Sequence, residues 1–467
     1  MQAFEVAKAL KEAEPGLSVE FHFSESLGDK NLTDPLWKMP GKGVFTEDLT
    51  SDLIAGRADM VVHSWKDLPV EEKPETEIAA TLPRADARDL LLFKKSSRPR
   101  CRPGAQLRIF SSSPRREYNL KPFLREHLPG SPGGIEFLSV RGNIPTRLRK
   151  LLETPEVDGL VVAKAAIDRL LGTTEEEFAS ARRQVGEALA ACDWMVLPLS
   201  VNPAAAAQGA LAIEIRRDRE DLKKLLAKIH DARTFTEAVR EREILSSHGG
   251  GCHQKIGATV LHRHGSDLRF VRGLTEKGVE LREKILANSF RGDVIPLRSD
   301  WLFERRPLPD VSLPAGTSAV FLAHEKAWPG SLVFHGILWT AGLTTWKKMA
   351  QKGHWVNGSS EGLGESEDPR IERLAGALSW ASLTHSLSPG PVRGVGVVTY
   401  ELVPRANSEA PPESGTLYWS SATLFHEALR RWPHLAGRDH ACGPGKTWDI
   451  LKDRVKNLHL RWPLEEN

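Results

Sequence analysis

Short apolar runs alternate with helical patterns over roughly the first 216 residues, and this alternation predicts the architecture. A period of two predicts a strand over residues 17–23, and a helical period follows over residues 46–55. Uninterrupted apolar runs predict buried strands over residues 59–63, 90–93, 107–110 and 159–162. Because short strands that alternate with helices build layered structures, we expect α/β layers with a largely parallel sheet.

The pattern changes twice further along the chain. Residues 219–245 are predicted to form one long helix, and strands of a smaller α+β unit are predicted over residues 260–271 and 279–285. Residues 289–314 are rich in Arg, Pro and Asp without a sustained period, so they are predicted to be a linker. Ten of the thirteen tryptophans lie at residue 301 or later, which indicates a separate domain. In that domain we expect strands over residues 319–322, 395–398 and 416–419, and polar loops over residues 359–368 and 406–415.

Composition narrows the class of protein. A chain of 467 residues is too long for one core, so several domains are expected. The formal net charge of +3 is too small to indicate a nucleic-acid partner. No segment approaches the roughly 18 apolar residues that a membrane span needs, and residues 1–8 are typical of an amphipathic helix rather than a signal peptide. The four cysteines are scattered without a CxxC pair, which favours a reducing, cytoplasmic setting over a disulfide framework.

Two arginine-rich segments follow predicted strands at the points where helices begin. The first is Ser111-Ser112-Ser113-Pro114-Arg115-Arg116, and the second runs from residue 139 to 149 and contains Arg141 and Arg147. Each of these arginines, taken alone, is explained as a solvated surface charge without a ligand. Two clusters at equivalent turns instead favour a polyanion site, because ligands of open α/β sheets bind at that edge and helix starts suit anions.

An acidic residue follows the predicted strand 59–63. Asp67, beside Lys66, is a candidate for acid–base work or for stabilising a cation, while a helix cap or a local ion pair is the structural alternative.

A glycine-rich loop carries one cysteine. Three glycines precede Cys252, and His248 and His253 flank the loop. A buried thiol rarely needs such flexible neighbours, and no second cluster supplies a fourth metal ligand, so no metal is expected. A nucleophile or covalent anchor is the favoured interpretation.

Together and in order, these segments resemble the porphobilinogen deaminase family over about residues 1–287. The matching runs are residues 41–45 (GKGVF), 58–69 (ADMVVHSWKDLP), 87–89 (ARD), 112–116 (SSPRR), 140–143 (VRGN), 146–148 (TRL), 208–214 (QGALAIE), 241–242 (ER) and 250–252 (GGC). The family's opening strand is absent here, and Ala207 stands where the family usually has a glycine.

The resemblance implies a definite chemistry. Members join four porphobilinogen molecules head to tail, release ammonia each time and hydrolyse off hydroxymethylbilane. The chain grows on a dipyrromethane cofactor that is held by a thioether to a cysteine, which here matches Cys252. The essential carboxylate matches Asp67, next to Lys66, and would stabilise the cationic azafulvene left by deamination.

The resemblance also assigns binding residues. Those expected to hold the cofactor, besides Cys252, are Arg115, Arg116, Ser112, Ser113, Lys66 and Asp67. Those expected to bind substrate are Arg141, Arg147, Lys42, Ser64, Asn143 and Arg169.

The C-terminal segment resembles uroporphyrinogen-III synthase, an enzyme that cyclises hydroxymethylbilane. The pieces are residues 319–322 (AVFL), 342–345 (GLTT), 353 (G), 397–400 (VVTY), 419–422 (WSSA) and 442–447 (CGPGKT), and the presumed catalytic helper matches Tyr400. Three hypotheses stay open: a bifunctional enzyme, a deaminase with a structural tail, and a solute-binding protein that clamps a polyanion. The last would need neither Asp67 nor the cysteine loop.

The resulting expectation is a monomer of five segments. Residues 1–90 with 196–217, and residues 91–195, would form two doubly wound α/β lobes similar to type II periplasmic binding proteins. Residues 218–288 would form a small α+β domain with the cofactor cysteine, residues 289–316 a linker, and residues 317–467 an α/β synthase-like domain.

Overall fold

The computed structural model describes residues 1–23, 47–71, 73–249 and 255–462. The chain divides into two compact units. Unit 1 comprises Met1–Arg125, Pro132–His262 and Arg269–Glu283, and unit 2 comprises Glu126–Ser131, Arg263–Leu268 and Lys284–Asn467. Within the described ranges, no helix has the length and apolar character needed to cross a membrane.

The first sheet of unit 1 is antiparallel. Its strand order is β1(Val61–Ser64), β8(Leu211–Arg216), β2(Thr76–Ala80), with β8 in the middle. Helices α1(Gln2–Ala13), α3(Glu47–Ile54) and α8(Glu220–Leu226) accompany it. Val6 and Leu10 of α1 are buried against Leu211 and Ile213 of β8, because the apolar side of an amphipathic helix closes the face of the sheet.

The second sheet of unit 1 is mixed. Its strand order is β5(Gly134–Leu138), β4(Gln106–Phe110), β6(Gly159–Ala163), β3(Asp89–Lys94), β7(Cys192–Val196). Strand β4 runs parallel to β5 and β6, whereas β3 runs antiparallel to β6 and β7. The expected largely parallel sheet is therefore wrong, because an apolar run has the same pattern in either chain direction.

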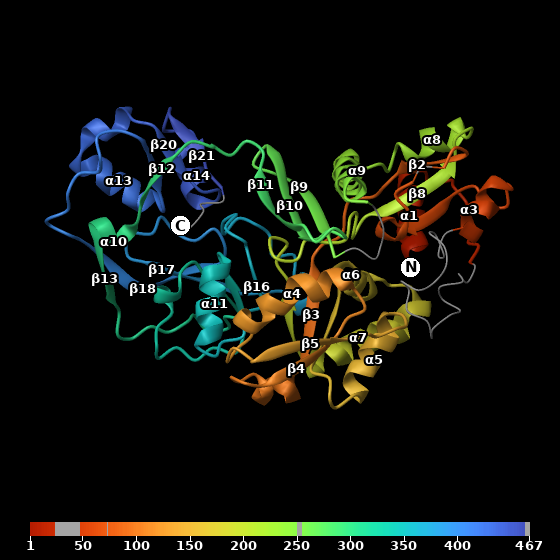
Figure 1. The fold of residues 1–467 in the computed structure, drawn as a ribbon, viewed down its shortest axis with the longest axis horizontal. Helices are drawn as coiled ribbons and strands as arrows, with labels where there is room; N and C mark the ends of the chain where they lie inside the picture. Colours follow the sequence, from red (N-terminus) through yellow and green to blue (C-terminus); the bar gives the residue numbers. More distant parts are fainter. Residues whose placement is uncertain (24–46, 72, 250–254, 463–467) are drawn as a thin grey trace. The chain divides into compact units, whose positions relative to one another are not determined.

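Helices surround this second sheet. They are α4(Pro114–His127), α5(Ile144–Glu153), α6(Lys164–Gly172) and α7(Ala179–Ala191), with the 3₁₀ helices η3(Lys95–Arg100) and η4(Glu176–Phe178). Helices α5 and α7 pack against each other and against strands of the sheet (Figure 1). Parallel neighbours need such crossovers, and α4 and α5 supply them between β4, β5 and β6.

Two other local predictions in unit 1 fail. Residues 17–23 form no strand; instead Phe21 stacks on Phe4 of α1 with ring centroids 4.4 Å apart, so the alternation reflects aromatic packing. The single helix predicted over residues 219–245 is two helices, α8 and α9(Ala232–Ser247). The break occurs because the Asp231 side chain accepts a hydrogen bond from Thr234 N and caps a new helix.

The segment predicted as a small α+β structure combines α9 with a three-stranded sheet of β9(Gly257–Arg263), β10(Ser266–Leu274) and β11(Glu280–Leu286). Ile256, Ala258 and Val271 form its core, against Ile244 and Leu245 near the end of α9.

Unit 2 contains two sheets. One has the order β13(Phe303–Pro307), β18(Val395–Pro404), β17(Trp380–His385), β14(Ala319–Leu322), β15(Ile337–Thr340), β16(Gly358–Ser359). The other is parallel, with the order β12(Val294–Leu297), β19(Thr416–Trp419), β20(His440–Cys442), β21(Leu458–Leu460). The accompanying helices are α10(Ser299–Leu302), α11(Leu343–Gln351), α12(Glu372–Ala375), α13(Ala422–Arg431), α14(Lys446–Leu451), η5(Glu325–Ala327) and η6(Pro433–Gly437).

The structure corrects two sequence predictions in unit 2. The expected linker contains β12, which pairs with β19, and β13, which pairs with β18. Both partners lie far along the chain, so no local pattern reveals them. The expected polar loop over residues 359–368 is half buried: Glu365, for example, accepts a hydrogen bond of 2.5 Å from the Ser382 hydroxyl.

Gly394 provides a test of the packing of unit 2. Its φ is +68°, and a Cβ there would collide with the backbone oxygen of Trp380, at the start of β17. Gly394→Ala is expected to lower the free energy of unfolding of unit 2 by about 2 kcal/mol more than Gly376→Ala does, because overpacking adds to the cost of the left-handed backbone.

Gly376 is the matched control, since its φ is +72° and no atom lies within 4 Å of the added Cβ. Chemical denaturation followed by tryptophan fluorescence measures the difference. Equal destabilisation by the two substitutions would contradict the predicted collision.

Candidate active site

Two neighbouring strand-to-helix turns of the mixed sheet are joined by one serine. The Ser112 hydroxyl, after β4, donates to Val140 O at 2.6 Å and accepts from Val140 N at 2.9 Å. It also lies 3.1 Å from the Ser139 hydroxyl. The turns that carry the two arginine clusters are thus fixed to each other, as expected for adjacent parallel strands.

Arg115 and Arg116 converge on one buried carboxylate, that of Asp89 at the start of β3. Arg116 makes a two-pronged contact with Asp89 at 3.0 and 2.7 Å, and Arg115 Nη2 donates to the same carboxylate at 2.9 Å. The side-chain amides of Asn202 and Gln208 add hydrogen bonds at 2.8 and 2.9 Å. Burial by itself would raise the pKa of Asp89, but Arg116 and Arg115 hold that pKa well below its usual range.

One carboxylate balances only one of the two guanidinium charges, and further cations lie close by. Burial, followed by repulsion from Arg116 and Arg141, lowers the pKa of Arg147 to about 10, while Asp67 acts in the opposite direction. A guanidinium whose pKa is lowered in this way lies in a crowd of positive charge. The four groups are therefore close enough to interact.

Lys66 belongs to the same electrostatic neighbourhood. Burial lowers its pKa, Asp67 raises it, and Arg116 and Arg115 lower it again. Its ammonium donates to Gln208 Oε1 at 3.4 Å, which connects η2(Trp65–Asp67) with the group around Asp89. Lys66 and Arg147 thus both interact electrostatically with Asp67 and Arg116, Lys66 also with Arg115 and Arg147 also with Arg141.

This arrangement suits a ligand with several carboxylates. A polyanion would offset the repulsion among Arg147, Arg116 and Arg141, which adds to burial in lowering the pKa of Arg147, and guanidinium groups bind carboxylates through paired hydrogen bonds. The residues present therefore fit a dipyrromethane, whose side chains are carboxylic acids.

The structure places the other predicted site residues as follows. Asn143 caps α5, because its side-chain oxygen accepts from Thr146 N at 3.0 Å. Arg169 donates to Glu5 at 3.2 Å and to Gly209 O at 2.9 Å. Ser64 immediately precedes η2, and Ser113 O accepts the first hydrogen bond of α4, from Glu117 N. Lys42 and Cys252 lie outside the described residues.

Sequence reasoning missed the residues that hold the arginines. Asp89 and Gln208 were noted only as parts of matching runs, and Asn202 carried no signal. Ala207 adopts a φ of +62° and so occupies the left-handed position where the family usually has a glycine. In the sequence, this alanine in place of the usual glycine was the one indication of a left-handed backbone conformation before Gln208.

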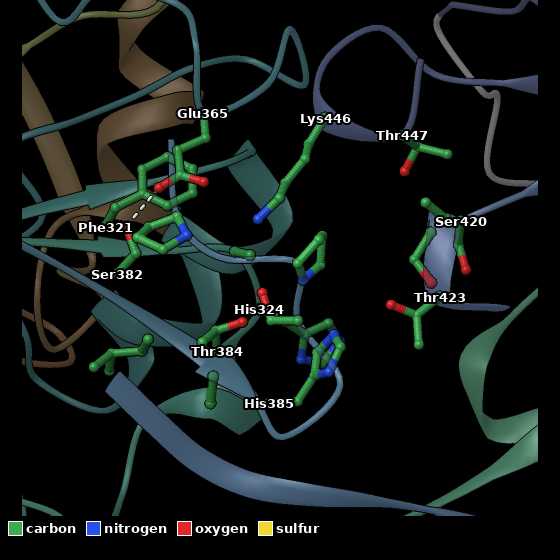
Figure 2. A pocket seen from close by; sticks show the side chains of 18 of the residues that line it. Phe321, His324, Glu365, Ser382, Thr384, His385, Ser420, Thr423, Lys446 and Thr447 are labelled. Atoms are coloured by element: carbon green, nitrogen blue, oxygen red, sulfur yellow. Dashed lines mark hydrogen bonds between the residues drawn. The ribbon is translucent and has the colours of Figure 1, made fainter. Parts of the chain in front are cut away.

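Unit 2 contains a polar cavity of about 220 Å³. It is lined by Tyr400, His385, Lys446 and Glu365, together with hydroxyls such as those of Ser420 and Thr423. In Figure 2 the Lys446 ammonium is directed into the cavity, and His324 and His385 lie on the same side as each other. Burial, with Lys446 and then Arg305, lowers the pKa of His385 to about 4, so this imidazole is neutral at pH 7.

Tyr400 lies among these groups. Arg305 is 5.9 Å from the centre of its ring, and His385 is 5.7 Å from it, centroid to centroid. Burial raises the pKa of Tyr400, and Arg305 opposes that shift. Among the described residues, Arg305 Nε and His385 Nδ1 are buried without a hydrogen-bond partner.

Unit 1 is thus an α/β unit in which Arg115 and Arg116, at a strand-to-helix turn, are held by the buried Asp89. The family model "Porphobilinogen deaminase, dipyromethane cofactor binding domain" matches residues 1–224. The chain belongs to the porphobilinogen deaminase family.

Individual relatives match a longer part of the chain. A porphobilinogen deaminase of Syntrophomonas wolfei subsp. wolfei is 36% identical over 273 residues, which is 58% of this chain and 80% of the relative. Those of Natranaerobius thermophilus and Syntrophus aciditrophicus are each 33% identical, over 54% and 58% of this chain and 73% and 80% of their own lengths.

Asp89→Asn tests the contact that holds the arginines. The substitution is expected to lower the free energy of unfolding at pH 7 by about 3–5 kcal/mol, because it leaves buried guanidinium charge uncompensated. Asp193→Asn is the control, since its partner Arg98 is about half exposed and such pairs contribute at most about 1 kcal/mol.

The pH dependence has a defined sign. The folded-state pKa of Asp89 is lowered, so its contribution is complete above the unfolded value near 3.9 and is lost as the pH falls further. Urea denaturation of wild type and Asp89→Asn should therefore differ most at neutral pH and converge in acid. A difference that stays constant below pH 4 would argue against an ionised Asp89.

Proposed function

We propose that the chain is a hydroxymethylbilane synthase that joins four porphobilinogen molecules on a covalent dipyrromethane. The observation that carries the proposal is the pair of linked strand-to-helix turns, in which Ser112 joins the two arginine segments and Asp89 holds Arg115 and Arg116. It lies in the part of the chain that matches the cofactor-binding domain of the family.

The chemistry follows from charge. The dipyrromethane supplies the pyrrole carbon to which the first substrate is joined. Arg141 and Arg147 bind acetate and propionate groups and fix their positions, which raises the effective concentration of the reacting carbons. The Asp67 carboxylate accepts a hydrogen bond from a pyrrole N–H and stabilises the positive charge that develops as ammonia leaves porphobilinogen.

Arg115 and Arg116 act differently from Arg141 and Arg147. Their hydrogen bonds to Asp89 fix both guanidinium groups at the start of α4, and their excess charge adds to the field at the cleft. Lys66 lies next to Asp67, and burial lowers the pKa of its ammonium.

Cysteine chemistry supports Cys252 as the attachment point. Burial raises the pKa of Cys101, Cys192 and Cys442 to about 12 in each case, so these thiols are almost entirely protonated at pH 7. The thiolate is the nucleophilic form, which leaves the glycine-rich loop as the place for a carbon–sulfur bond.

Intact-mass measurement tests the covalent cofactor. Purified protein is expected to carry the added mass of two linked pyrrole units and to give a positive aldehyde colour reaction for pyrroles. Cys252→Ser should lack both and should lose porphobilinogen consumption. Cys101→Ser, at a half-buried thiol, should keep both. An unmodified polypeptide mass from an active preparation would refute the covalent attachment.

We further propose that unit 2 converts hydroxymethylbilane to uroporphyrinogen III. The supporting observation is the polar cavity that Tyr400, His385 and Lys446 line. The phenol of Tyr400 donates a proton to the leaving hydroxyl of the bilane, and Lys446 binds one of its carboxylates. The alternative is a deaminase whose C-terminal segment is structural.

Tyr400→Phe distinguishes these two functions. The full-length variant is expected to consume porphobilinogen at the wild-type rate but to form the ring-inverted isomer about 100-fold more slowly. Tyr418→Phe, at another buried tyrosine of unit 2, should form it normally. Chromatography of the product isomers measures the outcome. Wild-type protein that yields only the spontaneously cyclised isomer would make unit 2 structural.

A further inference from the structure

The dipeptide Glu241-Arg242 of α9 has no part in the binding chemistry described above, yet its two side chains fix different segments. Adjacent helical residues point about 100° apart, so they serve different sides of the helix. The Glu241 carboxylate binds Arg84 at 2.7 and 2.8 Å and accepts hydrogen bonds from Ala207 N and Val260 N. These contacts anchor α9 to the connection after β2, to the turn before Gln208 and to β9.

Arg242 binds the turn that carries Asp67. Its guanidinium donates to Trp65 O at 3.3 Å, to Leu68 O at 3.0 Å and to Pro69 O. The three carbonyls bracket Asp67 on both sides along the chain. Leu68 and Pro69 directly follow the end of η2, and Trp65 O also accepts the hydrogen bond of Leu68 N that closes η2.

Other contacts hold the start and the apolar side of the turn. Trp65 N donates to Ala210 O, Lys66 donates to Gln208, and Trp65 and Leu68 are buried against Ala238 and Phe235. Asp67 itself is exposed, and η2 has no side-chain cap hydrogen bond. Arg242 binds the carbonyls that follow Asp67, so the backbone that orients the carboxylate depends on this guanidinium.

We propose that Arg242 is a positioning residue for Asp67. It acts through the three carbonyls, and its loss allows the turn to rotate so that the carboxylate no longer meets the developing positive charge. The inference rests on the proposed deaminase function. The same helix ends at Ser247, shortly before Cys252 in sequence, so one rigid element precedes the cofactor loop and holds the acidic turn.

Steady-state kinetics of Arg242→Ala test the proposal, with kcat expressed per cofactor-loaded molecule as determined by intact mass. We expect kcat to fall about 30-fold or more while KM for porphobilinogen changes less than about threefold, because a misplaced carboxylate loses its contact with the transition state only. Arg242→Lys should recover part of kcat, since an ammonium reaches fewer of the three carbonyls.

Chemical rescue separates positioning from general stability. Arg242 lines a cavity of about 430 Å³ with Trp65, Phe235 and Glu243, which gives a small cation access to the site. Low millimolar guanidinium should raise kcat of Arg242→Ala several-fold, whereas sodium chloride at equal ionic strength should not. The control is Arg240→Ala, at an exposed position of the same helix on its opposite side, which should behave as wild type.

Each outcome has one interpretation. If kcat per loaded molecule of Arg242→Ala equals the wild-type value, if KM alone rises, or if guanidinium affects Arg240→Ala equally, Arg242 does not position Asp67. If Arg242→Ala unfolds and does not load cofactor, Arg242→Lys is measured instead. An unchanged kcat of Arg242→Lys overturns the proposal, and a fall in its kcat without a matching change in KM supports it. Wild-type protein without deaminase activity would refute the proposed function itself.

Discussion

The buried carboxylate of Asp89 is the contact on which the arrangement of unit 1 depends. It lies at the start of a strand and gathers two guanidinium groups and two side-chain amides from three other segments. Full burial makes each partner necessary, because a charge in such a place is tolerated only when it is paired and hydrogen-bonded. Through Gln208 the same group reaches Lys66, next to the acidic residue of the site.

Two arginines share one buried carboxylate, and under the proposed function the positive charge that Asp89 leaves unbalanced favours a polycarboxylate ligand. In unit 2, burial, with Lys446 and then Arg305, lowers the pKa of His385 to about 4, so the cavity beside Tyr400 contains a neutral imidazole.

Helix α9 shows how one element serves both architecture and chemistry. Glu241 is fully buried and joins segments that are remote in sequence, while the neighbouring Arg242 faces the turn of Asp67. The helix exists as a separate element because Asp231 starts it after the end of α8. The helix cap at Asp231 therefore determines where α9 begins and, with it, where Arg242 contacts the turn of Asp67.

The sequence by itself determined the α/β character, the candidate acid and arginines, and the family, because strand and helix periods and short motifs are local properties of the chain. It failed for the direction of β3, for the strands β12 and β13 in the expected linker, and for the half-buried polar segment around Glu365. Each of these depends on a partner that lies far along the chain. Likewise, Arg115 and Arg116 were recognisable as cations from sequence, but only the tertiary structure showed that Asp89 holds them. A contact between residues that are far apart in the chain cannot be inferred from a short stretch of sequence, whereas the period of a strand or helix is a property of consecutive residues.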